Sequence, residues 1–194
     1  LGAGKSGLAA SRLAKHLGFN ILLSDSNNIG KVNIDNIYIE EGGHSEKLLE
    51  SDFIIKSPGI PNHINIIKNA IKKGIPIISE IEFASWFSKS PIIAVTGSNG
   101  KSTTVNLIHN IFYKAGYDSM VGGNIGIPFS ENVYKELLTK KSNGIHILEL
   151  SSFQLEHIIH LSLEVACILN ISKDHLDRYN NYSEYRETKM KILT

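Results

Sequence analysis

The stretch Thr96-Gly97-Ser98-Asn99-Gly100-Lys101-Ser102-Thr103 guides the interpretation of this 194-residue chain. It follows the apolar run 92–96, which predicts a buried strand, and it leads into a predicted helix over about 101–115. A glycine-rich turn between a strand and a helix points backbone N–H groups and the helix dipole at one place, where they bind phosphate oxygens. Lys101 would add a charge near the terminal phosphates, and Ser102 would offer its hydroxyl to Mg²⁺.

This loop is a shorter variant of the general phosphate-binding pattern. That pattern has a glycine five residues before Gly100, where this chain has Val95. The alternative is an ordinary strand–helix turn that contains Gly-Lys-Ser by chance. The order of strand, turn and helix favours the phosphate site.

A second glycine turn opens the chain. Gly2-Ala3-Gly4-Lys5-Ser6-Gly7 matches G-x-G-x-x-G, and Asp25 ends the next predicted strand. A dinucleotide-binding fold places its ribose-binding acid there, so the pair alone suggests NAD. The same geometry serves other nucleotide diphosphates, and a tight turn without any ligand is a further alternative.

Short apolar runs alternate with longer amphipathic ones, which indicates an α/β fold. We expect a Rossmann-like unit over 1–82 and part of a P-loop-type ATP-binding unit over 83–194, with the chain cut at both ends. The predicted helices cover 5–17, 62–73, 81–87, 101–115 and 181–194. The predicted strands cover 20–24, 37–40, 52–56, 75–79, 92–96, 145–150 and 165–170.

Composition excludes several classes of protein. Lysine and arginine number 20 against 19 aspartate and glutamate, a net charge of +1, whereas nucleic-acid binders usually carry a clear basic excess. No apolar run approaches the roughly 20 residues that a membrane span needs. Cys167 is the single cysteine, which fits a reducing compartment. We therefore expect a cytoplasmic protein that binds neither nucleic acid nor membrane.

Polar residues follow two of the later strands. Glu149 lies near the end of strand 145–150, and His175 follows strand 165–170. The carboxyl ends of parallel strands face the ligand crevice, so a carboxylate there suits Mg²⁺ beside a phosphate loop. A solvated glutamate and a structural or exposed histidine are the alternatives. Lys189 lies on the last helix, where a lysine is ordinarily solvated.

Two further segments could contact a polar substrate. Ser151 and Gln154 follow Glu149 and offer a hydroxyl and an amide. Gly122-Gly123-Asn124-Ile125-Gly126 predicts a loop able to approach a ligand closely.

Together these segments resemble the Mur ligase family. The resembling stretches follow the family's order and cover nearly the whole chain: GAGKSGL (2–8), SPGI (57–60), TGSNGKST (96–103), GGNIG (122–126), LELSSFQLE (148–156), NISKDHLDRY (170–179) and YRETK (185–189). GGNIG and LELSSFQLE resemble the branch that joins D-glutamate to UDP-N-acetylmuramoyl-L-alanine. The phosphate loop alone would also allow a folylpolyglutamate synthase.

The resemblance implies that the first unit binds the UDP part of a sugar nucleotide rather than NAD. The family positions near the uridine and diphosphate fall on Ser6, Asp25, Ser26, Ser57 and Gly59. The second unit would bind ATP through residues 97–103, and two Mg²⁺ ions through Ser102, Glu149 and His175. The residues facing the muramoyl-alanine end would be Asn124, Ser151, Gln154 and His175.

The resemblance also changes the interpretation of Lys189, which matches the family lysine that CO₂ converts to a carbamate. That reaction turns a cation into a carboxylate-like anion, which can bind or support Mg²⁺. Lys101, Glu149, His175 and Lys189 become the catalytic candidates. The implied protein is a monomer that makes an amide bond through an acyl phosphate.

Because the family's last domain carries most of the D-glutamate site, we expect this piece alone to bind nucleotides weakly and not to turn over. Three alternatives remain at this point: a folate ligase, an NAD-dependent oxidoreductase and a nucleotide-regulated binding module. The oxidoreductase leaves Lys101, Glu149 and His175 without a role.

Overall fold

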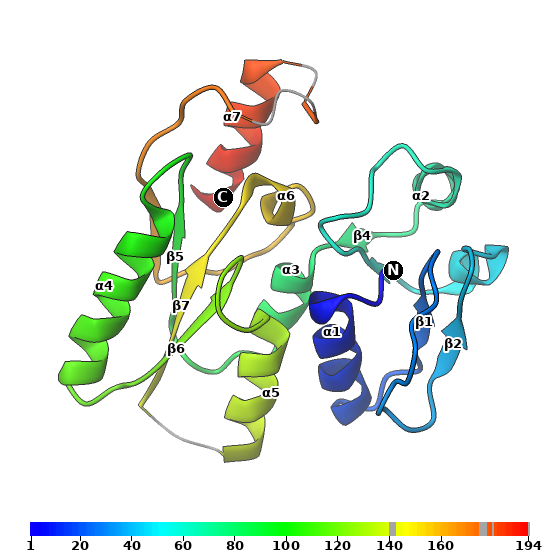
Figure 1. Cartoon of the computed structure of the whole chain (residues 1–194), viewed down its shortest axis with the longest axis horizontal. Helices are drawn as coiled ribbons and strands as arrows, with labels where there is room; N and C mark the ends of the chain where they lie inside the picture. Colours follow the sequence, from blue (N-terminus) through cyan, green and yellow to red (C-terminus); the bar gives the residue numbers. More distant parts are fainter. Residues whose placement is uncertain (140–142, 175–177, 180, 194) are drawn as a thin grey trace.

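The computed structural model describes residues 1–139, 143–174, 178–179 and 181–193 of the chain. The α/β fold expected from the sequence is confirmed, with two groups of parallel strands and helices packed beside them (Figure 1). None of the helices formed by these residues is long and apolar enough to cross a membrane.

Four parallel strands form one sheet in the order β6-β7-β5-β8. Their bounds are β5 (Ile92–Thr96), β6 (Asp118–Gly123), β7 (Gly144–Glu149) and β8 (Val165–Ile168). Every residue of β5 and β7 is buried, as expected of parallel strands covered on both faces. Alternate residues of β5 join different clusters: Val95 packs with α4 (Lys101–Lys114) and Ala94 with α5 (Phe129–Thr139).

The other strands form two pairs, β1 (Leu22–Ser24) with β2 (Tyr38–Glu40), and β3 (Ile54–Ile55) with β4 (Ile77–Ile78). The start of the chain lies between the pairs. The Leu1 amine donates to the Ile55 carbonyl at 2.7 Å, and the Gly2 N–H donates to the Ser24 carbonyl at 2.8 Å. The first glycine turn therefore connects a segment lying between the two strand pairs to α1 (Lys5–His16).

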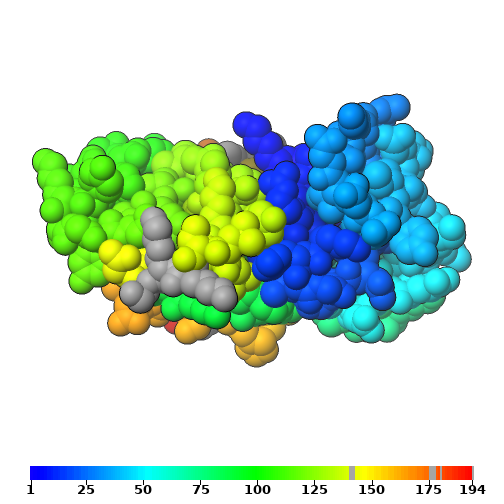
Figure 2. Space-filling view, turned by 90° about the horizontal axis from the view of Figure 1, so that it is seen from below, coloured from blue at the N-terminus to red at the C-terminus, as the bar shows by residue number. Residues whose placement is uncertain are grey.

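The two groups of strands share a hydrophobic core. One cluster combines Leu13 of α1, Phe83 of α3 (Glu80–Ser85) and Leu148 of β7. Seen from below in Figure 2, α1 in dark blue lies directly against α5 in yellow-green. Arg12 and Glu131 form an ion pair across this contact at 2.5 Å. The glycine loop after β5 and the first glycine turn are thus held on one packed body.

The helices and strands predicted from the sequence are present, most of them shorter than expected. Helix α2 (Asn65–Lys72) begins three residues later than predicted, and α3 ends before 87. The final helix α7 (Tyr182–Met190) does not run to 194 but ends in a 3₁₀ turn, η2 (Lys191–Leu193). Asn181 caps α7 as its spacing suggests, since its side chain accepts the Glu184 N–H at 3.0 Å.

The prediction of a loop over 122–126 is wrong at its start, because Gly122 and Gly123 are the last two residues of β6. A Cβ atom on Gly123 would lie 2.3 Å from the Glu149 carbonyl oxygen, so only glycine fits there. Four elements have no counterpart in the sequence prediction: η1 (Glu46–Glu50), β6, α5 and α6 (Ser152–Leu155).

Candidate functional site

The loop between β5 and α4 has the backbone shape of a phosphate cradle. Gly97 (φ +153°) and Gly100 (φ +83°) adopt conformations that favour glycine. Gly100 is the N-cap of α4, and no side chain of the described residues caps that helix. The first N–H groups of α4 therefore point at open space, where an anion can accept them.

Asn170, just after β8, fixes the shape of this loop. Its side-chain oxygen accepts the Asn99 N–H at 2.9 Å, and its side-chain amide donates to the Asn99 carbonyl at 3.0 Å. Its own carbonyl accepts the Ser98 N–H at 3.0 Å. The sequence reasoning missed this residue, although its place after a buried strand was a usable signal.

Lys101 folds back over the loop. Its ammonium donates to the carbonyl oxygens of Gly97 at 2.9 Å and Ser98 at 3.1 Å. Both acceptors are neutral, so a phosphate oxygen would be a stronger partner for the same cation. The Lys101 ammonium therefore lies against the loop between β5 and α4.

Glu149 ends β7 beside the loop and is 2% exposed, so the solvated alternative is wrong. Its carboxylate accepts from the Ser102 hydroxyl at 2.6 Å and from the Asn124 side-chain amide at 2.8 Å. A carboxylate next to a hydroxyl is an oxygen donor set that suits Mg²⁺. No group of three or more His, Cys, Asp or Glu side chains gathers among the described residues. The remaining ligands of a metal here would be phosphate oxygens and water, as Mg²⁺ prefers.

Lys189 of α7 contacts the same loop and is 2% exposed, so it is not a solvated lysine. Its ammonium donates to the Gly97 carbonyl at 2.9 Å and lies 4.9 Å from the centre of the Tyr185 ring. Burial, followed by repulsion from Lys101, lowers the pKa of Lys189 to about 8. The neutral form of this amine is therefore more accessible than that of an ordinary lysine.

Ser151 and Gln154 form a capping box at the start of α6 rather than an open polar pair. The Gln154 side chain accepts from the Ser151 N–H at 3.1 Å and is almost fully buried. Ser151 keeps partial exposure beside Glu149. His175 lies outside the described residues.

The first glycine turn is tightly constrained. A Cβ atom on Gly7 would lie 1.8 Å from the Gly2 carbonyl oxygen, whereas one on Gly4 would meet nothing within 4 Å. Asp25 accepts the Ala3 N–H at 2.7 Å, which ties the end of β1 to the turn. That bond and one from the Asn27 N–H hold the pKa of Asp25 below its ordinary value.

A pocket of about 480 Å³ opens beside Asp25. It gathers three of the predicted first-unit residues, Asp25, Ser26 and Gly59. Ser57 lies next to the glycine turn, where its hydroxyl donates to the Gly2 carbonyl at 3.3 Å, and Ser6 is the second residue of α1. The sequence reasoning missed the other residues that line the pocket: Asn27, His44, Ile60, Pro61, Ile64, Asn65 and Ile66.

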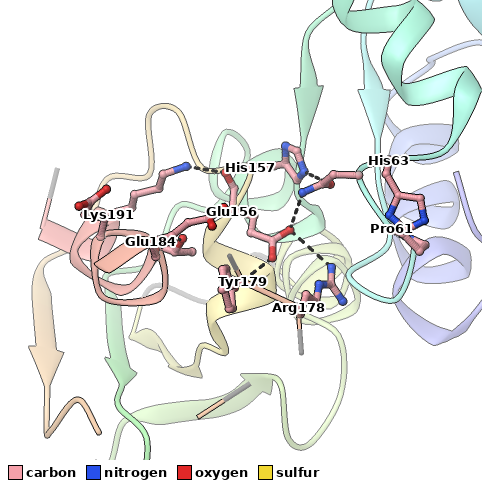
Figure 3. Close-up of a pocket in the computed structure, with 11 residues that line it drawn as sticks. Pro61, His63, Glu156, His157, Arg178, Tyr179, Glu184 and Lys191 are labelled. Carbon is pink, nitrogen blue, oxygen red and sulfur yellow. Dashed lines mark hydrogen bonds and ion pairs between the residues drawn. The ribbon is translucent and has the colours of Figure 1, made fainter. Parts of the chain in front are cut away.

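A second cavity, of about 740 Å³, lies between the loop after Gly59 and helices α6 and α7 (Figure 3). Glu156 is at its centre. The carboxylate accepts from the Asn62 side chain at 3.1 Å, from the Tyr179 hydroxyl at 3.0 Å and from Arg178 at 3.5 Å. Arg178 also donates to the Pro58 carbonyl at 2.7 Å. Glu156 and Arg178 thus fasten the loop 57–62 to the residues around α7.

Lys56 supports the same loop from within. It is 2% exposed, and its ammonium donates to the Ile60 carbonyl at 2.7 Å. Burial lowers the pKa of Lys56 to about 8. Burial and then repulsion from Lys56 lower the pKa of His157 to about 4, so His157 is a neutral partner for Asn62, 2.9 Å away.

The family model of the Mur ligase middle domain matches residues 95–194, and that of the MurD N-terminal domain matches residues 2–66. A UDP-N-acetylmuramoylalanine--D-glutamate ligase of Christiangramia forsetii is 42% identical and covers 99% of this chain. A protein of the same name from Chlorobium phaeobacteroides is 41% identical over the same share.

The chain spans about 44% of the first relative's length and about 43% of the second's. Among solved structures, UDP-N-acetylmuramate:L-alanyl-gamma-D-glutamyl-meso-diaminopimelate ligase from Neisseria meningitides has a TM-score of 0.58 at 18% identity. The match covers 96% of this chain and 63% of that one, and it supports the fold. By sequence and by fold, the chain belongs to the Mur ligase family.

Proposed function

We propose that this sequence is part of an ATP-dependent ligase that joins D-glutamate to UDP-N-acetylmuramoyl-L-alanine in peptidoglycan precursor synthesis. The observation that carries the proposal is the convergence of Lys101, Glu149 and Lys189 on one glycine loop from three different elements. The names of relatives at 41–42% identity support this reaction over other amide ligations. The match of residues 2–66 to an N-terminal domain model supports it over a folate ligase.

Residues 1–82 would form the unit that binds the UDP sugar. The pocket beside Asp25 supports this role, because it combines an apolar wall with polar groups near a helix N-terminus. Ser6, Ser57 and Gly59 would face the diphosphate next to the glycine turn. The same turn would accept NAD only if the pocket beside Asp25 fitted an adenosine. The names of the relatives favour a uridine nucleotide instead.

Residues 83–194 would form part of the ATP-binding unit. The N–H groups of residues 97–103 and the Lys101 ammonium would hold the phosphates. Ser102 and Glu149 would hold Mg²⁺, with His175 and a modified Lys189 as further candidates. When bound, the metal would neutralise phosphate charge, while Asn124 keeps the Glu149 carboxylate oriented.

Lys189 would carry a carbamate. A neutral amine attacks CO₂ and loses one proton, giving an N-carboxylate. The buried position and the lowered pKa of Lys189 both favour the neutral amine that this addition needs. The resulting anion would attract Lys101, which donates to the same Gly97 carbonyl, whereas an ammonium at Lys189 repels it.

In the proposed reaction the alanyl carboxylate attacks the γ-phosphorus of ATP and forms an acyl phosphate and ADP. The amine of D-glutamate then attacks the acyl carbon, loses a proton and expels inorganic phosphate. The first step needs positioning and charge neutralisation more than covalent help, and Lys101 supplies both. Asn124, Ser151 and Gln154 would position the muramoyl-alanine end.

The test is phosphate release by a protein that carries this sequence at the length of its relatives. UDP-N-acetylmuramoyl-L-alanine, D-glutamate and ATP are each omitted in turn. Release that requires all three supports the proposal. Release that persists without the sugar nucleotide, or that accepts a folate in its place, would refute it.

A further inference from the structure

The pocket beside Asp25 is lined by two kinds of residue. Ile60, Pro61, Ile64 and Ile66 contribute apolar surface. Asp25 and His44 are among the residues that contribute polar groups. A pocket with both kinds of lining suits a planar heterocyclic base, which packs on apolar surface and is recognised by polar groups at its edge.

Asp25 is held in place by the backbone around it. Its two oxygens accept the N–H groups of Ala3 at 2.7 Å and Asn27 at 2.9 Å. These bonds shape the turn and the loop after β1. His44 lines the same pocket, and its hydrogen-bonding role follows from the residues behind it.

His44 has a fixed tautomer because of the residues behind it. Its Nδ1 lies 2.8 Å from the hydroxyl oxygen of Ser24, which is fully buried. The single hydroxyl hydrogen of Ser24 points to Glu40 at 2.5 Å or to the Gly43 carbonyl at 3.2 Å, and both of these only accept. The Ser24 oxygen must then accept from His44, so Nδ1 carries the hydrogen. In the neutral ring Nε2 is consequently an acceptor.

No hydrogen bond of Nε2 is found among the described residues, and His44 lines the pocket. We propose that His44 is a specificity-determining residue that accepts a hydrogen bond from the imide N–H of a uracil base. This inference rests on the proposed binding of a uridine diphosphate sugar. Ser24 and Glu40 would be positioning residues that keep Nε2 an acceptor.

The chemistry selects between bases. Uracil has an N–H at its ring position 3, whereas cytosine has a lone pair there, which would face the lone pair of Nε2. A methyl group on N3 of uracil removes the donor and adds bulk. A site that hydrogen-bonds a group discriminates against the analogue that lacks it, because its own polar atom then loses that partner.

The test is calorimetric titration of this chain at pH 8 with UDP, with N3-methyl-UDP and with CDP. The unaltered chain should bind UDP on the order of tenfold or more tighter than the other two. His44→Phe keeps a flat ring without a nitrogen, so it should weaken the binding of UDP and remove the preference for UDP over the other two nucleotides. His44→Gln keeps an acceptor and should retain part of this preference. His16→Phe, on α1 away from the pocket, should leave the preference unchanged.

Equal binding of UDP and N3-methyl-UDP by the unaltered chain would overturn the role of His44 and leave the proposed function standing. An unchanged preference in a folded His44→Phe variant would do the same. Failure of the folded ligase-length protein to bind UDP or the full sugar nucleotide would contradict both proposals. Ser24→Ala should reduce the preference for UDP without abolishing binding, since the ring is then free to exchange tautomers.

Discussion

The Lys189 ammonium lies 2.9 Å from the carbonyl oxygen of Gly97, although 92 positions separate the two residues. This contact joins the last helix to the first residue of the phosphate loop. It places a buried amine where Lys101 also donates. The loop is therefore bordered by two lysines and one carboxylate.

Lys189 should form a carbamate. Its pKa is lowered from 10.5 to about 8, so the neutral fraction of the amine grows as the pH rises toward and past 8. With ¹³C-labelled bicarbonate and the dissolved CO₂ concentration held constant, the carbamate signal in NMR should increase from pH 6.5 to 8.5. Lys189→Met should lose the signal and the exposed Lys114→Met should keep it. A signal that survives in Lys189→Met would locate the carbamate elsewhere.

Lys101→Ala should abolish productive use of ATP. The ammonium is the cation placed on the loop carbonyls, and removing one preorganised donor to a reacting phosphate costs about 10²–10³ in rate. Phosphate release by the ligase-length protein measures this, with Lys114→Ala as the control. A loss of less than threefold would mean that the loop does not hold the γ-phosphate.

Gly7→Ala should damage the first unit, whereas Gly4→Ala should not. The added methyl group on residue 7 would meet the Gly2 carbonyl at 1.8 Å, and at residue 4 it meets nothing. Overpacking of this kind costs about 1–3 kcal/mol or more, since backbone must move. Urea unfolding gives the stability of both variants, and UDP titration gives their binding. Equal behaviour of the two would contradict the turn geometry.

Arg178→Ala should raise the KM for the sugar nucleotide by about tenfold while the KM for ATP stays within twofold. Arg178 holds the Pro58 carbonyl, between Ser57 and Gly59, and its loss releases that loop. Steady-state kinetics of the ligase-length protein separate the two constants, with the exposed Arg186→Ala as the matched control. Equal changes in both constants would indicate a general structural defect instead.

Glu80 should make stability depend on pH. The carboxyl is buried and accepts the Ser130 N–H at the start of α5. Burial raises its pKa from 4.5 to about 7, so the folded state binds an extra proton between these values. Binding of this proton stabilises the folded state by on the order of 3 kcal/mol. The stabilisation is complete below pH 4.5 and is lost as the pH rises through 7.

Urea unfolding between pH 5 and 8 tests this dependence. The unaltered chain should lose stability relative to Glu80→Gln as the pH rises. Glu50→Gln, at an exposed position, should follow the unaltered chain. Parallel curves for Glu80→Gln and the unaltered chain would show that Glu80 does not titrate in this range.

The strand–loop–helix segment 92–114 and the first glycine turn could be predicted because each is encoded locally. Their glycines must adopt particular backbone conformations, and their apolar residues recur with a clear period. The unpredicted β6 has no β-branched run and ends in two glycines. Its strand character comes from pairing with β7, which contributes from a distant part of the sequence.

The candidate site was predictable only where a residue type carries a chemical role. Lys101, Ser102 and Glu149 are such residues, and the structure brings them together. Lys56, Glu156 and His44 were not predicted, because their significance comes from burial and from partners far away in the chain. A lone histidine or glutamate in a sequence gives no sign of those contacts.

Binding of a UDP sugar by the first unit is the property on which the proposed ligase function depends. Calorimetric titration of this chain with UDP-N-acetylmuramoyl-L-alanine measures it, with NAD as the parallel ligand and Asp25→Ala as the matched variant. The sugar nucleotide should bind, Asp25→Ala should weaken that binding at least tenfold, and NAD should not bind. Binding of NAD without binding of the sugar nucleotide would refute the proposed function.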